Sequence, residues 1–259
     1  MRETLEKLAR GEISVDDAEQ ALKLDAVQKV GAIARLDVSR ATRRGVPELI
    51  LAEGKTEDDL VAICKHMLDH NRRAIVTRVS DTQLSRLREN FGPPHIFETF
   101  IHARSVVIKR DDFVLKKTGG KVGILTAGTA DLGVAEEAQM IANEMGCSTI
   151  LEADAGVAGI HRLSEPLLNL IKNDVDCLVV VAGREGALPT VVAGLVDRPL
   201  ISVPTSSGYG YGGKGTAALM AMLQACSLGL AVVNIDSGVA AGVVASQIAN
   251  RVARARENR

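Results

Sequence analysis

Two charged residues follow the apolar run at residues 177–183 of this sequence. Arg184 and Glu185 lie there between Gly183 and Gly186. In such a loop the guanidinium can bind an anion, and a carboxylate tuned by burial can act as a general base. The alternative is a solvated pair of charges on a surface loop.

An earlier apolar run, residues 121–127, is followed by "GTADLG". Gly128 permits a tight turn, Thr129 offers a hydroxyl, and Asp131 stands where a helix should begin. Backbone N–H groups at such a helix start can hold a phosphate, and an ordinary aspartate cap is the alternative. The chain lacks the G-x-G-x-x-G fingerprint of dinucleotide-binding folds.

The run at residues 148–154 ends in Asp154 and is soon followed by His161 and Arg162. His161 is the only histidine after residue 117. The His-Arg pair could bind an anion or move a proton, whereas a lone histidine can also be structural. Asp154 is a further candidate for ribose, phosphate or metal contacts.

The glycine-rich loop "TSSGYGYGGKG" contains both tyrosines of the chain, Tyr209 and Tyr211. Glycines and aromatic faces suit a flat ring or a mobile lid, so Ser207, Tyr209 and Gly210 are candidate binding residues. A flexible surface loop is the alternative. The loop lacks the Gly-Lys-Ser/Thr ending of a P-loop.

Cys226 lies near the end of the apolar stretch 214–227, and two interpretations compete for it. Free cysteines are commonly buried and inert, and the C-terminal end of a helix does not favour a thiolate. On this evidence alone Cys226 is a core filler, and only a wider pattern could make it a nucleophile.

These candidates need a scaffold, and the second half of the chain predicts one by its regular alternation of strands and helices. The expected strands are residues 121–127, 148–154, 177–183, 199–205 and 230–236, and the expected helices lie around 131–146, 159–173, 187–196, 214–227 and 239–256. This order predicts a doubly wound parallel sheet, which binds ligands at the carboxyl ends of its strands. The helix at 214–227 is apolar on every side, which predicts burial, including burial against another subunit.

A change in composition near residue 118 predicts two domains. Of the 24 glycines, 19 follow residue 117, whereas 21 of the 31 Lys and Arg residues precede residue 118. We therefore expect an N-terminal α/β domain over 1–117 and a sheet domain over 118–259, joined through "KKTGGK". In the first domain we expect two short initial helices, helices at 56–71 and 80–92, strands at 46–54 and 73–79, and one or two further strands over 97–110.

The overall composition argues against several classes of protein. A net charge of -1 and a pI near 6.5 give no basic excess for nucleic acid or an anionic membrane. The charged start is unlike a signal peptide, and no apolar run approaches the roughly 20 residues of a membrane span. Four cysteines far apart in the sequence disfavour disulfides and zinc, so we expect a reduced, cytoplasmic protein.

Three stretches, "AGIHRL", "AGREGALPTVVAGLVDRPLISVP" and "GTAALMAMLQACSLGLAVVNID", resemble the PurE-type aminoimidazole ribonucleotide carboxylases. His161-Arg162 matches the His-Arg of that family. Ala187 stands where the family has the histidine of a His-Leu-Pro segment, with Glu185 two residues earlier. Cys226 lies where those carboxylases have no nucleophile, which argues against simple purine-pathway chemistry.

The closer resemblance is to the LarB family of nickel-pincer nucleotide biosynthesis, whose members are PurE relatives with an extra N-terminal domain. It spans nearly the whole chain, including "LDVSRATRRGVPELILAEGKT", "SSGYGYGGKGTAAL" and "ACSLGLAVVNIDSG". It implies a PurE-like fold, magnesium and a homo-oligomer, with an octamer expected. The implied reaction uses carbon dioxide or bicarbonate to carboxylate the pyridinium ring of nicotinic acid adenine dinucleotide. The implied products, after hydrolysis of the phosphoanhydride, are pyridinium-3,5-biscarboxylic acid mononucleotide and AMP.

This chemistry gives Cys226 a role. A thiolate that adds to ring carbon four makes carbon five nucleophilic toward carbon dioxide, and cysteine is both a good nucleophile and a good leaving group. We expect Glu185 either to activate Cys226 or to move the proton at carbon five. The resemblance suggests that the other polar candidates hold the substrate and that Asp131 or Asp154 assists magnesium indirectly. The rival hypotheses are an aminoimidazole ribonucleotide carboxylase or mutase and a non-catalytic nucleotide-binding subunit.

Overall fold

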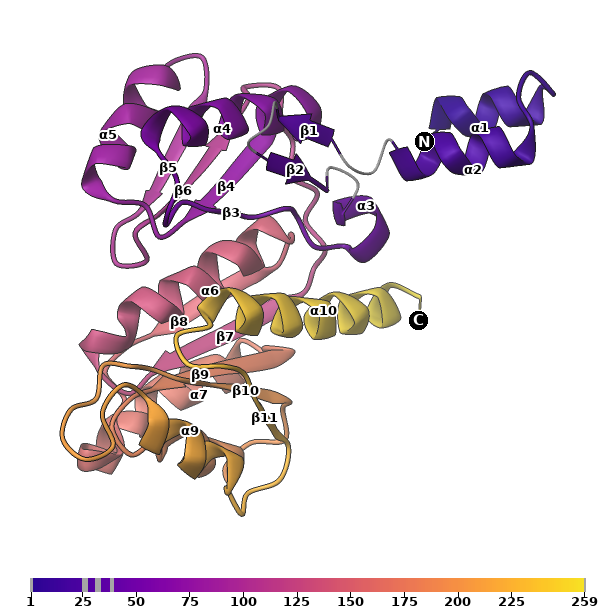
Figure 1. Cartoon of the computed structure of the whole chain (residues 1–259). Helices are drawn as coiled ribbons and strands as arrows, with labels where there is room; N and C mark the ends of the chain where they lie inside the picture. The colour runs from indigo at the N-terminus through magenta and orange to yellow at the C-terminus, as the bar shows by residue number, and fades with distance from the viewer. Residues whose placement is uncertain (1, 25–27, 31–33, 38–39, 259) are drawn as a thin grey trace. The chain divides into compact units, whose positions relative to one another are not determined.

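The computed structural model describes residues 2–24, 28–30, 34–37 and 40–258 (Figure 1). It divides into two compact units. The N-terminal unit comprises Met1–Thr99 and Val106–Phe113, and the C-terminal unit comprises Phe100–Ser105 and Val114–Arg259. No helix of the described residues is long and apolar enough to cross a membrane.

The C-terminal unit is built on a five-stranded parallel sheet with the order β11-β10-β9-β7-β8. The strands are β7 (Lys121–Thr126), β8 (Ser148–Glu152), β9 (Cys177–Ala182), β10 (Leu200–Pro204) and β11 (Leu230–Val232). In sequence order along the sheet this is 5-4-3-1-2, so the winding direction reverses between β7 and β9. Ligands bind at such a switch point in open α/β sheets.

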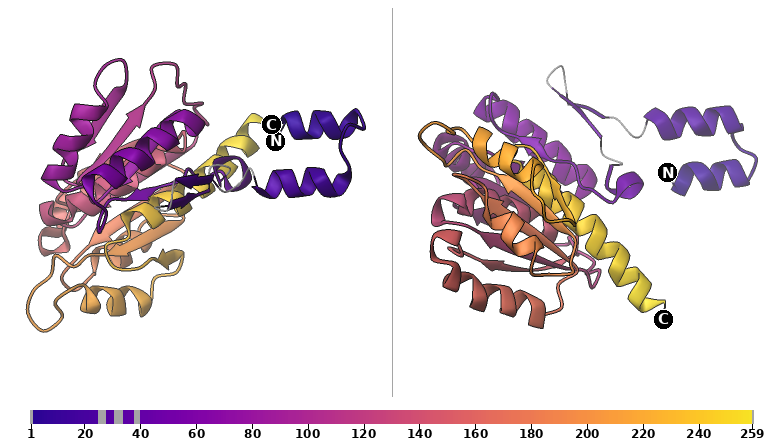
Figure 2. Two further views of the ribbon diagram at one scale, coloured as in Figure 1. Left: turned by 45° about the horizontal axis from the view of Figure 1, so that its top comes forward. Right: turned by 90° about the horizontal axis from the view of Figure 1, so that it is seen from below.

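Helices cover both faces of this sheet (Figure 1 and Figure 2). The helices of this unit are η1 (Thr129–Asp131), α6 (Leu132–Glu144), η2 (Val157–Leu163), α7 (Ser164–Lys172), α8 (Leu188–Ala193), α9 (Thr216–Leu223) and α10 (Gly238–Glu257). Alternate residues of the strands pack on α6 and α10 on one face and on α7, α8 and α9 on the other. The predicted doubly wound parallel sheet is therefore confirmed.

The packing of α6 on α10 depends on small residues. Ala138 and Ala142 of α6 face Ala241 and Ala245 of α10, all fully buried. A Cβ on Gly242 would overlap the Ile141 side chain and lie 2.6 Å from the Ala138 carbonyl oxygen. The two helices approach this closely because α10 carries no side chain at that point.

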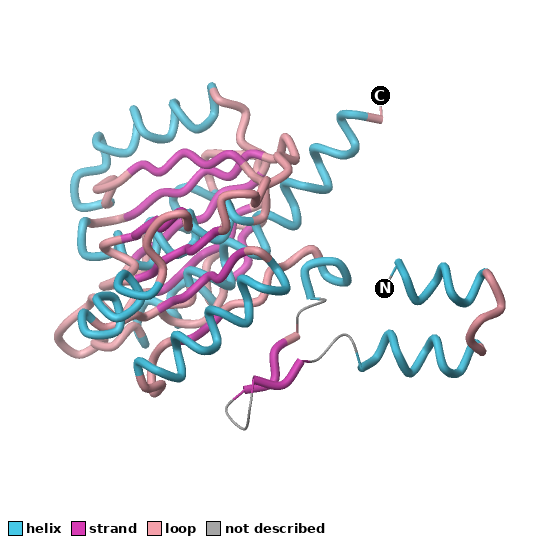
Figure 3. The backbone as a smooth tube through the Cα atoms, turned by 90° about the horizontal axis from the view of Figure 1, so that it is seen from above, coloured by secondary structure: helices cyan, strands magenta, loops and turns pink. Residues whose placement is uncertain are grey.

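The N-terminal unit contains a four-stranded sheet with the order β3-β4-β6-β5. Its strands are β3 (Ile50–Leu51), β4 (Arg73–Thr77), β5 (Ile96–Phe100) and β6 (Ser105–Lys109), with a separate antiparallel pair, β1 (Gln28–Val30) and β2 (Ala34–Leu36). Its helices are α1 (Arg2–Ala9), α2 (Val15–Leu24), α3 (Arg40–Arg44), α4 (Glu57–Asn71) and α5 (Asp81–Asn90). Figure 3 shows α1 and α2 side by side as a helical hairpin.

Local capping signals explain where these helices begin. The Thr56 hydroxyl accepts a hydrogen bond from the Asp59 N–H at the start of α4. At the start of α2, the Asp17 N–H donates to Ser14 Oγ and the Ser14 N–H donates to Asp17 Oδ2, which is a capping box. The predicted strand over 46–54 is wrong in length, because only Ile50 and Leu51 pair with β4.

Candidate functional site

A cavity of about 360 Å³ lies at the carboxyl ends of β7, β8, β9 and β10, at the switch point of the sheet. The loops after these strands line it with the residues Ala127, Gly128, Ala130, Asp131, Gly156, Val157, Ala158, Arg162, Ala182, Gly183, Arg184, Glu185, Ala187, Leu188, Ser207 and Tyr209. Eight of these are predicted site residues, namely Gly128, Asp131, Arg162, Gly183, Arg184, Glu185, Ser207 and Tyr209. The sheet thus brings together Gly128 and Tyr209, which are 81 positions apart in the chain.

Asp131 lines the cavity with a buried carboxylate. Its side chain is almost fully buried, with 3% of the residue exposed. Oδ1 accepts hydrogen bonds from the hydroxyls of Thr205 at 2.6 Å and Ser207 at 2.9 Å, and Oδ2 accepts the Gly128 N–H at 3.1 Å. The carboxylate therefore ties the loop after β7 to the loop after β10.

Gly183, in the loop after β9, also packs against this cluster of hydrogen-bonded side chains. A Cβ at this position would overlap Ser207 Oγ and approach Thr205 Oγ1 to 2.7 Å. The loop after β9 can pass over the hydroxyls only because residue 183 has no side chain. Thr205 was not among the predicted site residues, although a hydroxyl directly after a strand of a parallel sheet is the signal that could have identified it.

Arg184 and Tyr209 meet on the cavity wall. The Arg184 guanidinium lies 4.1 Å from the centre of the Tyr209 ring, within the range of a cation–π interaction. Arg184 also has a left-handed backbone, with φ of 52°, a conformation that non-glycine residues seldom adopt outside functional or strained sites. The next residue, Glu185, lines the cavity but is exposed. The residues of this chain therefore do not provide the burial that was expected to tune its carboxylate.

Arg162 reaches the cavity from the segment after β8 and is ion-paired with Asp154. Its Nη1 lies 2.9 Å from Asp154 Oδ2, and the Asp154 N–H donates to Thr126 Oγ1 at 3.2 Å. Asp154 does not itself line the cavity, but it holds the side chain of Arg162, which does. His161, in η2, is exposed and does not line the cavity, and neither do Thr129 and Gly210.

Cys226 is the predicted site residue whose position differs most from the sequence-based expectation. The predicted helix over 214–227 is shorter, because α9 ends at Leu223, and Cys226 lies in the following loop with its side chain exposed. The predicted burial of the helix is also wrong within one chain, since only Ala218 and Met222 of α9 are buried. The core-filler interpretation of Cys226 therefore fails.

The loop that carries Cys226 lies at the amino ends of the strands. Gly229, in that loop, accepts a hydrogen bond from the N–H of Leu200, the first residue of β10. Glu185 comes three residues after Ala182, the last residue of β9, and so lies at the carboxyl ends. Within one chain, Cys226 and Glu185 therefore do not share the cavity.

The other three cysteines are core residues. Burial raises the pKa of the Cys64 and Cys177 thiols to about 12 and also raises that of Cys147. These thiols stay protonated at neutral pH and are poor nucleophiles. Cys226 is the only exposed cysteine of the four.

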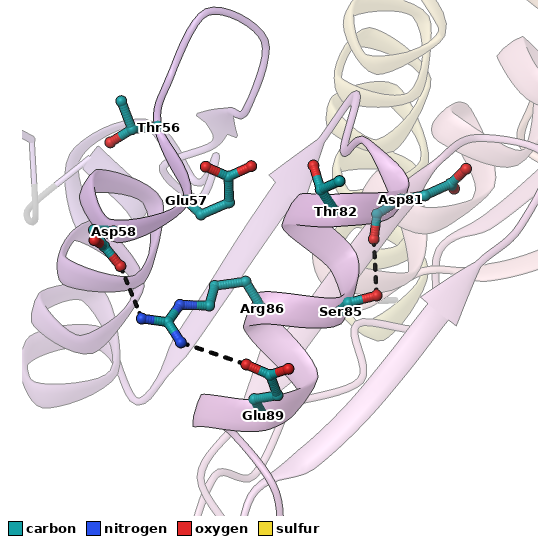
Figure 4. Close-up of a pocket in the computed structure, with 8 residues that line it drawn as sticks. All are labelled: Thr56, Glu57, Asp58, Asp81, Thr82, Ser85, Arg86 and Glu89. Carbon is teal, nitrogen blue, oxygen red and sulfur yellow. Dashed lines mark hydrogen bonds and ion pairs between the residues drawn. The ribbon is translucent and has the colours of Figure 1, made fainter.

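A second hollow, of about 640 Å³, lies between α4 and α5 in the N-terminal unit (Figure 4). Glu57, Asp58, Asp81 and Glu89 line it, and Arg86 bonds to Asp58 at 3.0 Å and to Glu89 at 3.4 Å. The acids at the helix starts complement the helix dipoles, which accounts for them structurally. Among the described residues that line this hollow, the one cation, Arg86, is paired with carboxylates, so an anionic substrate is better matched to the cavity of the sheet, where Arg184 lies.

The aspartates at and near the cavity are already engaged by protein groups. Magnesium favours carboxylates together with phosphate oxygens. Both oxygens of Asp131 already accept protein hydrogen bonds, and Asp154 is paired with Arg162. Among the described residues, no group of three or more His, Cys, Asp or Glu could hold a metal ion.

Comparison with known proteins matches both units. Residues 27–110 match the family model of the LarB/PurE-like N-terminal domain, and residues 121–258 match that of AIR carboxylase. The second match alone covers more than half of the chain. The chain belongs to the LarB/PurE family.

Three relatives illustrate its place in this family. The chain is 41% identical over 253 residues to an uncharacterised protein of Methanocaldococcus jannaschii, with 96% of both chains covered. It is 33% identical over 127 residues to an N5-carboxyaminoimidazole ribonucleotide mutase of the same organism, covering 48% of this chain and 76% of the relative. A mutase of that name from Thermotoga maritima is 28% identical over 133 residues, covering 49% and 74%. The two mutases thus share only about half of this chain.

Proposed function

We propose that this protein carboxylates the pyridinium ring of nicotinic acid adenine dinucleotide at carbon five and hydrolyses the phosphoanhydride. The products are pyridinium-3,5-biscarboxylic acid mononucleotide and AMP. The observation that carries the proposal is the exposure of Cys226. It is an accessible thiol on a PurE-type sheet, where the related carboxylases have no nucleophile.

The thiolate solves a chemical problem of the reaction. A pyridinium ring is electron-poor, so its carbon five does not attack carbon dioxide. Addition of the Cys226 thiolate to carbon four forms a C–S bond and breaks the aromatic system, and the ring becomes an enamine that is nucleophilic at carbon five. Carbon five then bonds to carbon dioxide, which leaves a proton on that carbon and positive charge on the ring nitrogen.

Loss of the carbon-five proton to a base returns the electron pair to the ring. That pair expels the thiolate from carbon four, which restores aromaticity and regenerates Cys226. Glu185 is the candidate base, either for this proton or for the initial thiol proton, because its carboxylate lies at the cavity. Water cleaves the phosphoanhydride in a separate step and gives AMP.

The substrate's charges suit the cavity. Arg162 and Arg184 offer guanidinium groups for the two phosphates, and Tyr209 offers an aromatic face. We expect magnesium, which the family resemblance implies, to bind the phosphate oxygens, because the aspartates near the cavity are already engaged by protein donors.

Cys226 and Glu185 can act on one substrate only if they come from different copies of the chain. Cys226 lies beside exposed apolar side chains that we call the α9 face, defined by Leu195, Met220, Leu223, Cys226 and Leu228. Exposed large apolar side chains that gather in one region of a protein mark interaction surfaces. We propose a homo-oligomer in which this face carries Cys226 to the cavity of a neighbouring copy.

Mass spectrometry of the protein incubated with the dinucleotide and bicarbonate tests the function. The native protein should gain a transient thioether adduct on Cys226 and release AMP and the dicarboxylated mononucleotide. Cys226→Ala should form no carboxylated product, whereas Cys64→Ala, which alters a buried thiol, should retain the chemistry. Wild-type carboxylation by Cys226→Ala would reject the mechanism.

The main alternative is an aminoimidazole ribonucleotide carboxylase or mutase, which the matched AIR carboxylase family favours. Ala187 argues against it, because this residue lines the cavity at the position where PurE enzymes carry a histidine. The same purified protein offered aminoimidazole ribonucleotides should give no product. A non-catalytic binding subunit would bind the dinucleotide without releasing AMP.

A further inference from the structure

Tyr209 and Arg184 form an unusual pair in the cavity. The guanidinium covers the face of the ring at 4.1 Å, although the Tyr209 side chain is otherwise well exposed, at 76%. Both residues line the same cavity as Glu185. One face of the ring is therefore occupied by a cation that belongs to the protein.

Arg184 differs in this respect from the other arginine of the cavity. Arg162 is held by the Asp154 carboxylate at 2.9 Å. No ion pair joins Arg184 to a carboxylate among the described residues, so its interaction with the protein is the aromatic face of Tyr209. A guanidinium held only by a ring can be drawn away by a stronger anionic partner, such as a phosphate.

A pyridinium substrate creates a conflict at this point. Its ring carries a positive charge, which Arg184 repels at short range and which the Tyr209 face attracts. Its phosphates carry negative charge and attract the same guanidinium. The repulsion is relieved and the attraction is satisfied if the guanidinium leaves the Tyr209 ring for a phosphate while the pyridinium takes the position of the guanidinium on the ring.

The chain can accommodate this exchange without moving its backbone. Arg184 is an exposed, long side chain, and its backbone is packed closely by Gly208, where a Cβ would lie 3.0 Å from the Arg184 nitrogen. The two loops are thus held together at their backbones, next to the Asp131 cluster. Only side-chain torsions need to change.

We propose that Tyr209 is a specificity-determining residue that selects cationic rings by exchanging the Arg184 guanidinium for the pyridinium of the substrate. This inference rests on the proposed function and adds to it the residue that recognises the charge of the ring. It assigns Arg184 to the phosphates of the bound dinucleotide. Glu185, next in the chain, is then left beside the ring.

Calorimetric titration in a Cys226→Ala background, in which no adduct consumes the ligand, tests the ring contact. Tyr209→Leu should raise the Kd for nicotinic acid adenine dinucleotide by about three- to thirtyfold, the worth of one cation–π contact. Tyr209→Phe is the matched control and should stay within about twofold, because it keeps the aromatic face. The reduced dihydropyridine dinucleotide, whose ring is neutral, should bind equally to all three proteins.

Arg184→Gln tests the exchange by a change of sign. With the dinucleotide it should weaken binding, because a phosphate contact is lost. With nicotinic acid riboside, which has the cationic ring and no phosphate, it should tighten binding, because no guanidinium competes for the tyrosine face.

The outcomes separate this inference from the function on which it rests. No dinucleotide binding to the parent protein would reject both. Binding by the parent that Tyr209→Leu leaves unchanged, or riboside binding that Arg184→Gln weakens, would reject the exchange and leave the proposed carboxylation standing.

Discussion

Asp131 shows how one buried residue can hold together the loops that form the cavity. The family resemblance suggested a contact with substrate or an indirect role toward magnesium. In the fold its two oxygens accept hydrogen bonds from Thr205, Ser207 and the Gly128 N–H. A buried carboxylate used in this way holds loops in place, because each donor would otherwise be left unpaired.

Asp131→Ala should therefore lower the free energy of unfolding by about 1–3 kcal/mol, since it leaves three donors without their acceptor. Urea denaturation followed by circular dichroism measures the change. Thr129→Ala, on the same turn but exposed, is the control and should stay within about 0.5 kcal/mol of the native protein. Equal stabilities of the two variants would show that the Asp131 cluster contributes nothing.

At the scale of elements, the sequence patterns predicted the strands of the C-terminal sheet better than the ends of its helices. Continuous apolar runs such as residues 177–182 identify buried strands because both faces of a parallel sheet are covered. The end of α9 was misplaced because no glycine or proline follows Leu223, where the helix ends, before Gly229. A sequence pattern locates the end of a helix poorly where such a stop signal is missing.

The contact between α6 and α10 leads to a prediction for Gly242. Gly242→Ala should destabilise the protein by about 1–3 kcal/mol, although alanine favours helices, because the added methyl group overlaps Ile141 and the Ala138 carbonyl. Val244→Ala, on the exposed side of the same helix, should change stability by less than about 0.5 kcal/mol. Thermal melting of both variants compares them, and a stabilised Gly242→Ala would contradict the close packing.

At the scale of the whole molecule, the α9 face determines whether the proposed site can be complete. Leu223→Lys places a charge on that face and should shift the protein to a smaller species in size-exclusion chromatography with light scattering. Val114→Lys changes another highly exposed apolar residue and should leave the oligomer intact. A protein that is monomeric before mutation would contradict a site shared between copies.

Mixing two inactive variants tests the sharing directly. Cys226→Ala lacks the nucleophile and Glu185→Gln lacks the proposed base, so each should be inactive alone. Co-expressed, they should regain part of the activity, because some sites then combine an intact Cys226 from one copy with an intact Glu185 from another. Mixed oligomers that stay inactive would place both residues in the same chain's site.

The amino-acid sequence by itself determined the alternation of strands and helices and the positions of the loops with reactive residues. These follow from local hydrophobic patterns and from the rule that parallel strands present their carboxyl ends at one edge. The tertiary structure decided which loops meet, since the order β11-β10-β9-β7-β8 arises from long-range packing of faces that no local pattern encodes. It also decided that Cys226 is exposed at the opposite ends of the strands from Glu185, because α9 returns across the sheet before β11 begins.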